Sequence, residues 1–481
     1  MTVADRAASS GREQVRGYRP SFNISPILDG NARLTNEQLL ELYQHAPLTD
    51  LGRWAFQVVN RLHPEDYRTY VIDRNINYTN ICTARCTFCA FKRNDKAAPD
   101  AYTLDDEAIY KKIEELVAIG GTQILMQGGM NPDLPIEYYE TLLRGIRERF
   151  PEVHIHAFSP PEFVEFARFF KMPVGEVLRR FKEAGLATVP GGGGEIFSER
   201  VRKRIGPGKC SGEEWLNVMS EAHKLGMHTS VTMLIGHIED ISDRLDHMSR
   251  IRERQDWALA NAPASYTAFI HWTYQPDNTP LDRKRKWDPD SGGRGGAFEF
   301  DNGRTVRLAD ANEYLRMLAL ARIYFDNIKN MQSSWVTMGP KIGQLALFFG
   351  ANDMGSVMME ENVVSAAGTS YRLSEEMICR LIRDSGWVPA QRNQYYKVLR
   401  RHDGPESPDL KPRVAGKFGP RQHRITPEEA TAYKAAGWSG LGTGAGKSVS
   451  LNVVSAQGGA EDYHGQNDGG CCGHSASAAS D

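Results

Sequence analysis

Residues 75–93 read NINYTNICTARCTFCAFKR, and this stretch holds three of the chain's seven cysteines within eight positions. Cys82, Cys86 and Cys89 follow the pattern C-x3-C-x2-C. They come directly after a run, VIDRNINYTN, that is typical of a strand. Three thiols are one too many for a simple disulfide and one too few for a four-cysteine zinc site.

Short apolar or β-branched runs alternate with amphipathic helical segments from residue 71 onward. In the segment TLDDEAIYKKIEELVAIG, apolar residues recur at helical spacing, and we expect Thr103 to cap this helix. Ser211 and Glu214 form a capping box at the start of SGEEWLNVMSEAHKLG. Because parallel strands need crossover connections, the alternation predicts an α/β fold, a full or partial βα barrel of the TIM type. The predicted strands are VIDRNINYTN, TQILMQGG, VHIHAFSP, LATVPGGG, HTSVTMLIGH, SYTAFIHWTYQP and KNMQSSWV.

The composition along the chain predicts three parts. Residues 1–70 are expected to form a polar tail and a helical extension, and residues 71–400 the barrel with its C-terminal elements. Residues 401–481 are expected to be a linker and a disordered tail. Their Gly-, Ser- and Ala-rich end buries too little apolar surface to offset the entropy of ordering. Residues 282–306, rich in Gly and charge, are expected to be a surface insertion.

The overall composition excludes several classes of protein. Hydrophobic residues make up 41% and charged residues 25% of the 481, as in soluble globular proteins. The formal net charge of −2 gives no reason to expect a nucleic-acid partner. The N-terminus has no signal-peptide core, and no apolar run reaches the roughly 18 residues of a spanning helix. We therefore expect no membrane partner and a cytoplasmic location.

Several predicted strands are more polar than the strands of a parallel barrel, which are usually buried on both faces. Because side chains alternate between faces, His154, His156 and Phe158 share one face of the third strand. The other single-face polar sets are Asn75, Asn77 and Thr79 in the first strand, Ser265, Thr267, His271, Thr273 and Gln275 in the sixth, and Gln332 and Ser334 in the seventh. Any one of these can be an ordinary hydrogen-bonded core residue. Together they predict a polar lumen that receives a polar ligand at the C-terminal ends of the strands.

Three kinds of site are consistent with the clustered cysteines. A structural zinc site needs four protein ligands, and no neighbouring Cys-x-x-Cys or His-x-His pair completes it. A redox pair of Cys86 and Cys89 would leave Cys82 without a role. A [4Fe–4S] cluster held by three thiolates accounts for all three and leaves one iron open to a ligand. The spacing favours the cluster, and a non-catalytic iron–sulfur or zinc protein is the alternative of a different class.

The cysteine pattern, with an aromatic residue just before its last cysteine, resembles that of the radical S-adenosylmethionine (SAM) superfamily. The resemblance implies a βα barrel in which Cys82, Cys86 and Cys89 hold a [4Fe–4S] cluster and SAM chelates the open iron. MQGG at residues 126–129 resembles the superfamily's glycine-rich stretch that receives the methionyl amine of SAM. QGG alone also fits an ordinary β-to-α turn.

Further residues are candidates to contact SAM. Phe88 is placed to lie against the adenine or to pack in the core, and Glu195 to touch SAM or to cap the next helix. Arg202 and Lys209 are candidates to bind a carboxylate of SAM or of the substrate, with solvated helix charges as the alternative. The predicted cofactor-binding set is Phe88, Gln127, Gly128, Gly129, Ser159, Glu195 and Arg202.

Longer segments resemble a narrower family, the cyclic dehypoxanthine futalosine synthases of the futalosine route to menaquinone. The likeness covers about residues 70–385 and includes FPEVHIHAFSPPE, AGLATVPGGGGEIFSERVR and FIHWTYQPDNTPL. Aminofutalosine synthase and the deazaflavin (FO) synthase subunits share the outline. The Trp and Gln-Pro of the last segment favour the cyclase over both relatives.

The resemblance implies an enzyme that abstracts hydrogen from the ribose C4′ of dehypoxanthine futalosine and closes a ring onto its benzoate. It also implies a small nucleoside-like substrate and a low-potential electron donor of the flavodoxin or ferredoxin type. The reaction needs a proton acceptor, and Glu162, His154 and His156 are candidates by position. Cys471 and Cys472 in the tail are either bystanders or a metal-binding pair.

Overall fold

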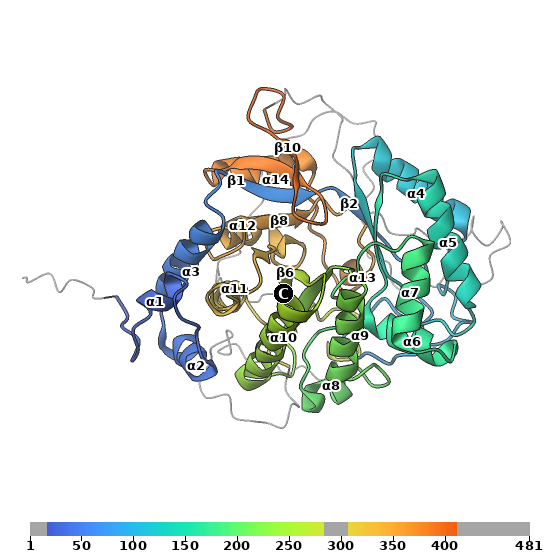
Figure 1. Ribbon diagram of the computed structural model, residues 1–481, viewed down its shortest axis with the longest axis horizontal. Helices are drawn as coiled ribbons and strands as arrows, with labels where there is room; N and C mark the ends of the chain where they lie inside the picture. Colours follow the sequence, from blue (N-terminus) through green and yellow to red (C-terminus); the bar gives the residue numbers. More distant parts are fainter. Residues whose placement is uncertain (1–16, 283–305, 411–481) are drawn as a thin grey trace, which may run out of the picture.

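The computed structural model describes residues 17–282 and 306–410. The predictions for the C-terminal tail, for Cys471 and Cys472 and for almost all of residues 282–306 lie outside the described residues. Figure 1 shows helices arranged around a central group of strands. None of the helices in the described ranges combines the length and the hydropathy needed to cross a bilayer.

The parallel strands close into a ring. In order they are β1 (Tyr67–Val71), β2 (Asp73–Ile76), β3 (Gln123–Met126), β4 (His154–Ala157), β5 (Thr229–Ile235), β6 (Tyr266–Thr273), β7 (Asn330–Met331) and β8 (Asp353–Ser356). Isolated bridges at Thr188 and Val189 join β4 to β5. A bridge from Gln332 to Asp353 and the pairing of β8 with β1 close the ring. The TIM-like barrel predicted from the alternation of strands and helices is confirmed.

Amphipathic helices cover the outside of this barrel (Figure 1). They are α4 (Asp106–Ala118), α5 (Ile136–Arg149), α6 (Pro160–Phe169), α7 (Val174–Ala184), α8 (Glu199–Ile205), α9 (Gly212–Lys224), α10 (Ile241–Asn261), α11 (Ala311–Tyr324) and α12 (Trp335–Ala346). The predicted capping box of Ser211 and Glu214 is confirmed at the start of α9. The predicted cap of α4 is wrong, because Asp105 accepts the capping hydrogen bond there. The Thr103 hydroxyl lies 3.0 Å from the Thr79 hydroxyl instead.

The predicted helical extension at the N-terminus is present and packs on the barrel. It comprises α1 (Ser25–Leu28), α2 (Asn36–His45) and α3 (Leu48–Leu62). α3 buries an apolar face that includes Trp54 and Val58 and packs against α11. The buried guanidinium of Arg316 on α11 donates to the carbonyl oxygens of Tyr43 (3.1 Å) and Ala46 (2.8 Å) at the end of α2. The extension is therefore fixed to the barrel by both apolar packing and buried hydrogen bonds.

A C-terminal hairpin closes one end of the barrel. After α13 (Val363–Ala366) and α14 (Glu375–Asp384), β9 (Val388–Arg392) pairs in parallel with β1 and returns as β10 (Val398–Arg401). In the hairpin turn, the Tyr395 ring stands edge-on to the rings of His154 (5.2 Å between centroids) and His228 (5.8 Å). Both histidines lie at the N-terminal ends of their strands, so this hairpin covers the end of the barrel opposite the cysteines.

The inward face of β6 differs from the prediction. Where β5 advances by two residues, from Thr229 to Val231, its partner β6 advances by three. This bulge shifts the alternation, so Trp272 rather than His271 lines the barrel interior. His271 packs outward, where its Nε2 lies 3.0 Å from the carbonyl oxygen of Tyr314 on α11. The prediction that His271 shares the lumen face is wrong.

Candidate active site

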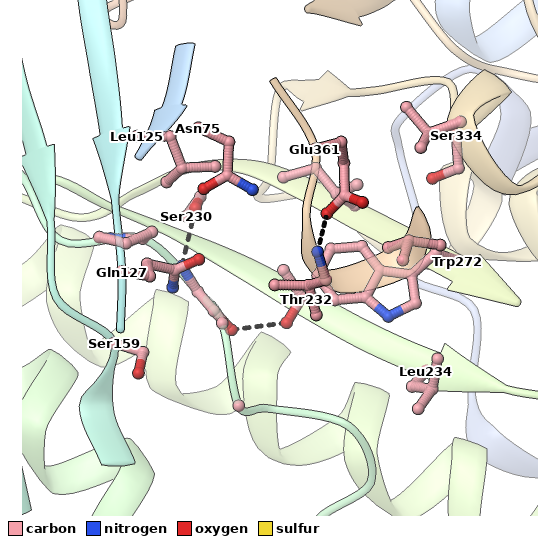
Figure 2. Close-up of a pocket in the computed structure, with 18 of the residues that line it drawn as sticks. Asn75, Leu125, Gln127, Ser159, Ser230, Thr232, Leu234, Trp272, Ser334 and Glu361 are labelled. Atoms are coloured by element: carbon pink, nitrogen blue, oxygen red, sulfur yellow. Dashed lines mark hydrogen bonds between the residues drawn. The ribbon is translucent and has the colours of Figure 1, made fainter. Parts of the chain in front are cut away.

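A cavity of about 420 Å³ occupies the barrel interior. The loop of Cys82, Cys86 and Cys89 lines one end, and the hairpin lines the other with Arg392, Gln394 and Tyr396. Figure 2 shows Asn75, Leu125 and Gln127 on one wall of this space, with Thr232 and Trp272 among the side chains across it. The polar lumen predicted from the strand pattern is therefore present, with apolar and aromatic side chains added to it.

Backbone hydrogen bonds hold the cysteine loop over the end of the barrel. The N–H of Cys82 donates to the carbonyl oxygen of Arg93 (2.9 Å), and the N–H of Thr83 to that of Met130 (3.0 Å). The Asn94 amide donates to two further carbonyl oxygens, those of Cys82 and Ala84, each at 2.7 Å. The loop is thus fixed between the segment after it and the turn after β3.

The three thiols lie around one small apolar cluster that contains Ala84 and Met130. Within the described residues, no three His, Cys, Asp or Glu side chains are gathered as they would be around a single metal ion. Burial raises the pKa of the Cys86 thiol to about 12, although Lys209 opposes the rise. Thiolates are stable in such surroundings only beside a compensating positive charge, which a bound metal cluster supplies.

The Glu162 carboxylate organises the hydrogen bonds around the QGG turn, residues 127–129. Its Oε1 accepts hydrogen bonds from the Tyr78 hydroxyl (2.7 Å) and the Gly128 N–H (3.0 Å). Its Oε2 accepts two more, from the N–H and the hydroxyl of Ser159, each at 2.7 Å. Burial raises the pKa of this carboxyl group, and the four donors oppose the rise. Since four donors occupy the carboxylate, its contacts favour a positioning role over the proton-acceptor role predicted from the sequence.

The two glycines of QGG make room for protein rather than for a ligand alone. A Cβ atom on Gly128 would lie 2.6 Å from the Tyr78 ring. A Cβ atom on Gly129 would lie 2.1 Å from the carbonyl oxygen of Ile81, immediately before the first cysteine of the loop. Both glycines line the cavity and allow the turn after β3 to contact the strand that leads to the cysteines.

Glu195, Lys209 and Phe88 form a second polar group at the cysteine end. The Lys209 ammonium lies 2.7 Å from Glu195 Oε1 and 5.3 Å from the centroid of the Phe88 ring. Glu195 Oε2 is buried and has no hydrogen-bond partner among the described residues. All three side chains line the cavity. Glu195 Oε2 can therefore accept a hydrogen bond from a hydroxyl or amine group of a bound molecule.

Arg202 was predicted to contact SAM, but the structure places it outside the cavity lining. Its guanidinium donates to the carbonyl oxygens of Gly193 (3.0 Å), Gly194 (2.8 Å) and Cys210 (2.7 Å). These contacts favour a role in shaping the glycine-rich loop before Glu195. The predicted contact with SAM has no support from them.

Strained backbone conformations mark the ends of three strands. Phe158 follows β4, Glu195 follows the segment that bridges β4 and β5 through Thr188 and Val189, and Met358 follows β8. Their φ angles are positive, at 58°, 34° and 53° respectively. Such conformations are costly for residues with a Cβ atom and persist where surrounding contacts impose them. Glu195 and Met358 line the cavity. Tyr396 of the hairpin also has a positive φ, 61°, and lines the cavity, so strained residues occur at both of its ends.

The two histidines predicted as proton acceptors have different places. His156 lines the cavity, with its Nδ1 2.7 Å from the Thr188 hydroxyl and its Nε2 3.2 Å from the Gln394 amide nitrogen. His154 is outside the cavity lining, with its Nε2 2.7 Å from the same hydroxyl. Burial lowers the pKa of His156 and that of His154, the latter to about 4. The structure keeps only His156 within reach of a ligand.

Asp73 is a cavity residue that the sequence prediction missed. Its Oδ1 accepts from the Ser356 hydroxyl and its Oδ2 from the Gln123 amide at 3.2 Å. Behind it, Arg392 forms a bidentate ion pair with Asp353 at 2.6 and 2.9 Å. The signal was present in the strand alternation, because residue 73 shares the face of residues 75 and 77.

Comparisons with known proteins agree with this site. Residues 76–251 match the model of the radical SAM superfamily, and residues 302–404 match that of the CofH/MqnC C-terminal region. Cyclic dehypoxanthine futalosine synthase of Halalkalibacterium halodurans is 44% identical over 80% of this chain and 98% of that protein. The Streptomyces coelicolor enzyme of the same name is 42% identical over 82% of this chain and 93% of its own length.

More distant relatives fit the same outline. The 5-amino-6-(D-ribitylamino)uracil–L-tyrosine 4-hydroxyphenyl transferase of Methanopyrus kandleri is 38% identical over 70% of this chain and 85% of that protein. The crystal structure of methylornithine synthase (PylB) superposes with a TM-score of 0.55 at 17% identity, over 76% of this chain and 96% of that one, which shows a shared fold. The chain therefore belongs to the radical SAM superfamily and, within it, to the family that contains cyclic dehypoxanthine futalosine synthase.

Proposed function

We propose that this radical SAM enzyme cyclises dehypoxanthine futalosine in menaquinone biosynthesis. The observation that carries the proposal is one cavity that joins the cysteine loop to a polar interior with an aromatic wall. The likeness to two synthases of that name, over more than nine tenths of their length, supports the same assignment.

The residues at the cysteine end fit the cofactors of the superfamily, a [4Fe–4S] cluster and SAM. Cys82, Cys86 and Cys89 supply three thiols, and Glu195 Oε2, which accepts no hydrogen bond in the described chain and lies 4.0 Å from the Arg202 guanidinium, is an acceptor beside them. Gln127 and the N–H groups around it lie at the same end of the cavity. A cluster and SAM held there would supply the radical chemistry that removes a hydrogen atom from C4′ of the substrate ribose.

The middle of the cavity suits a nucleoside-like molecule that carries an aromatic ring. The Asn75 Oδ1 and Gln123 Oε1 atoms are buried acceptors without hydrogen-bond partners in the described residues. Ribose hydroxyl groups would satisfy both atoms and remove the cost of leaving them unpaired. Trp272 lies across the cavity from Asn75 and offers an apolar face to a benzoate ring.

Asp73 is the proton acceptor that we assign to ring closure. Four acidic residues line the described cavity. Glu162 is occupied by four donors and Glu195 Oε1 is paired with Lys209, whereas Glu361 holds the backbone of α13 through the N–H groups of Val363 and Ser365. Each oxygen of Asp73 accepts one hydrogen bond from a neutral side chain and keeps capacity for another. Burial raises the pKa of Asp73, which increases its affinity for a proton.

The proposed function is tested by anaerobic incubation of the reconstituted, reduced protein with SAM and dehypoxanthine futalosine. We expect 5′-deoxyadenosine and a product two hydrogens lighter than the substrate: one hydrogen atom leaves to the deoxyadenosyl group, and the second leaves as a proton and an electron, which the oxidised cluster would take up. Incubations with the precursors of aminofutalosine and of the deazaflavin run in parallel. Turnover of only one of those precursors would refute the cyclase assignment.

An Asp73→Asn variant tests the proton acceptor separately. The amide keeps the size of the side chain and cannot accept the proton. We expect SAM cleavage to persist and the yield of cyclised product to fall by about 100-fold or more, the usual contribution of a general base. Unchanged product formation would remove Asp73 from the mechanism and leave the cyclase assignment standing.

A further inference from the structure

The protein surface beside Cys86 is built from two chain segments. The N–H of Arg85 donates to the carbonyl oxygen of Pro207 (2.9 Å), and the N–H of Thr87 donates to that of Ile205 (2.6 Å). These bonds flank Cys86 on both sides and fix the end of α8 against the cysteine loop. The last turn of α8 is therefore adjacent to the loop that holds the thiols.

The basic residues of α8 and the turn after it separate into an inward and an outward set. Arg202 is buried on backbone carbonyl groups, and Lys209 is paired with Glu195. Lys203 and Arg204 are exposed, as is Arg85 on the cysteine loop. We call the three exposed residues, Arg85, Lys203 and Arg204, the basic patch.

The basic patch differs from many exposed basic side chains of this protein in lacking counter-ions. Arg149, Arg168 and Arg179 are paired with glutamates at 2.5–2.9 Å. No carboxylate of the described residues forms an ion pair with any of the three patch residues. The C-terminus of a helix accounts for a preference for Lys203 and Arg204 there, but not for Arg85, which lies on a different segment.

We propose that the basic patch is the docking surface for an acidic, low-potential one-electron carrier of the flavodoxin or ferredoxin class, which reduces the cluster held by the three cysteines. This inference rests on the proposed function, since a radical SAM enzyme needs a reductant. In the step that it serves, one electron leaves the reduced carrier and enters the oxidised cluster, and no bond or proton changes place.

Two physical reasons select this surface and this partner. Arg85 is covalently adjacent to Cys86, so a protein seated on the patch lies next to a cluster ligand. Unpaired positive charges steer an acidic partner into this position and raise the rate of encounter, and salt screens the effect. The patch is thus an electrostatic guide on a surface that adjoins one of the cluster ligands.

The test compares two triple charge reversals of the holoenzyme. The patch variant carries Arg85→Glu, Lys203→Glu and Arg204→Glu. The control carries Lys111→Glu on α4 with Lys397→Glu and Arg400→Glu on the hairpin at the opposite end of the barrel. The control residues are also exposed and without ion pairs in the described chain, so both variants change the net charge by the same amount.

Two measurements are made on each variant, with an acidic flavodoxin as the probe. The first is the dissociation constant of oxidised flavodoxin at low and at high salt, which requires no turnover. The second is the rate of cluster reduction, by reduced flavodoxin and by photoreduced 5-deazariboflavin, a small neutral donor. Iron content and the absorption spectrum of the cluster verify that each variant is loaded.

For the patch variant we expect flavodoxin to bind at least about tenfold more weakly at low salt, with the difference vanishing at high salt. Reduction by the neutral donor should stay within twofold of the parent, and the control should match the parent throughout. Equal flavodoxin affinity in both variants would overturn the inference, as would an equal loss with the neutral donor. If the reversal prevents loading, the neutral variant with Arg85→Gln, Lys203→Gln and Arg204→Gln gives the same comparison with a smaller shift.

The outcome is independent of the substrate assignment. Flavodoxin affinity and cluster reduction are measured without dehypoxanthine futalosine, so a failure of the cyclase assay leaves the docking result readable. Conversely, the neutral donor supports the cyclase assay even where docking fails.

Discussion

The carboxylate of Glu162 accepts a hydrogen bond from the backbone N–H of Gly128 at 3.0 Å, and this contact joins the start of α6 to the glycine turn after β3. The same carboxylate binds the Tyr78 hydroxyl and caps its own helix through Ser159. One side chain therefore fixes the ends of three successive strands at the mouth of the cavity.

Replacement of Glu162 by Ala should destabilise the protein and weaken SAM binding together. Several buried donors would lose their acceptor, at roughly 1–3 kcal/mol for each orphaned group, so we expect a loss of about 3 kcal/mol or more. Glu165→Gln on the same helix is the matched control, because the partner of Glu165, Arg168, is half exposed and such pairs contribute about 1 kcal/mol or less. Denaturant unfolding and SAM titration measure both effects. Equal behaviour of the two variants would contradict the positioning role.

Replacement of Cys86 by Ala should abolish the cluster and leave the barrel folded. Cys86 packs in a small cluster apart from the main core, so its loss costs little packing. Cys210→Ser is the control, since Cys210 is buried on Arg202 and is not one of the three clustered thiols. Iron analysis should show an iron-poor Cys86 variant and a fully loaded control, with the same far-ultraviolet circular dichroism in both. A loaded, active Cys86→Ala protein would refute the assignment of the thiols.

The barrel could be predicted from the sequence because its strands and helices have different periods, and the cysteines because their spacing is unusual. The eighth strand was missed, since β8 is only DMGS and contains Gly355 at a φ of +76°. The hairpin was missed for a related reason: β9 reads VPAQR, with no apolar alternation and with Pro389 inside it. Short, polar strands that are stabilised by their neighbours leave little local signal.

The side-chain roles were harder to predict than the strands. Arg202 and Lys209 are both basic and belong to one segment. Only the folded path of α8 and of the turn after it directs Lys209 into the cavity and Arg202 onto backbone carbonyl groups. The choice between His271 and Trp272 depends on a bulge in the pairing of β5 with β6, which no single-strand pattern contains. Asp73 was within reach of the strand alternation, since it stands on the same face as Asn75.

The β9–β10 hairpin, which lines the cavity end opposite the cysteines, should govern the affinity for substrate and not that for SAM. Gln394 is buried against His156 and lines the cavity, whereas its neighbour Tyr395 is 50% exposed. Loss of one hydrogen bond at about 1–1.5 kcal/mol predicts a rise of roughly tenfold in the KM for dehypoxanthine futalosine in Gln394→Ala. Tyr395→Ala should raise it less than about twofold by the same reasoning. A tenfold change in SAM affinity in either variant would contradict the prediction, because it would show that the hairpin acts on SAM binding.

His271 should make the protein less stable as the pH falls below neutrality. Burial lowers the pKa of His271 to about 4 from its ordinary value of 6.5, and its hydrogen bond to Tyr314 only partly opposes this. Between these two values the unfolded chain binds one proton more than the folded chain, so acid favours unfolding. The stability contribution is complete above pH 6.5 and falls by about 1.4 kcal/mol per pH unit, roughly 3 kcal/mol in all by pH 4.

The change that isolates this effect is His271→Asn, with His271→Gln as a second variant of different size. Both should be less stable than the parent at pH 7.5, because each leaves a gap against the Tyr314 ring. Their disadvantage should then shrink steadily as the pH is lowered from 6.5 toward 4, since neither side chain takes up a proton. Denaturant unfolding across that range measures the difference, in which the remaining buried histidines cancel. Parallel curves for the parent and both variants would show that His271 is not neutral in the folded protein.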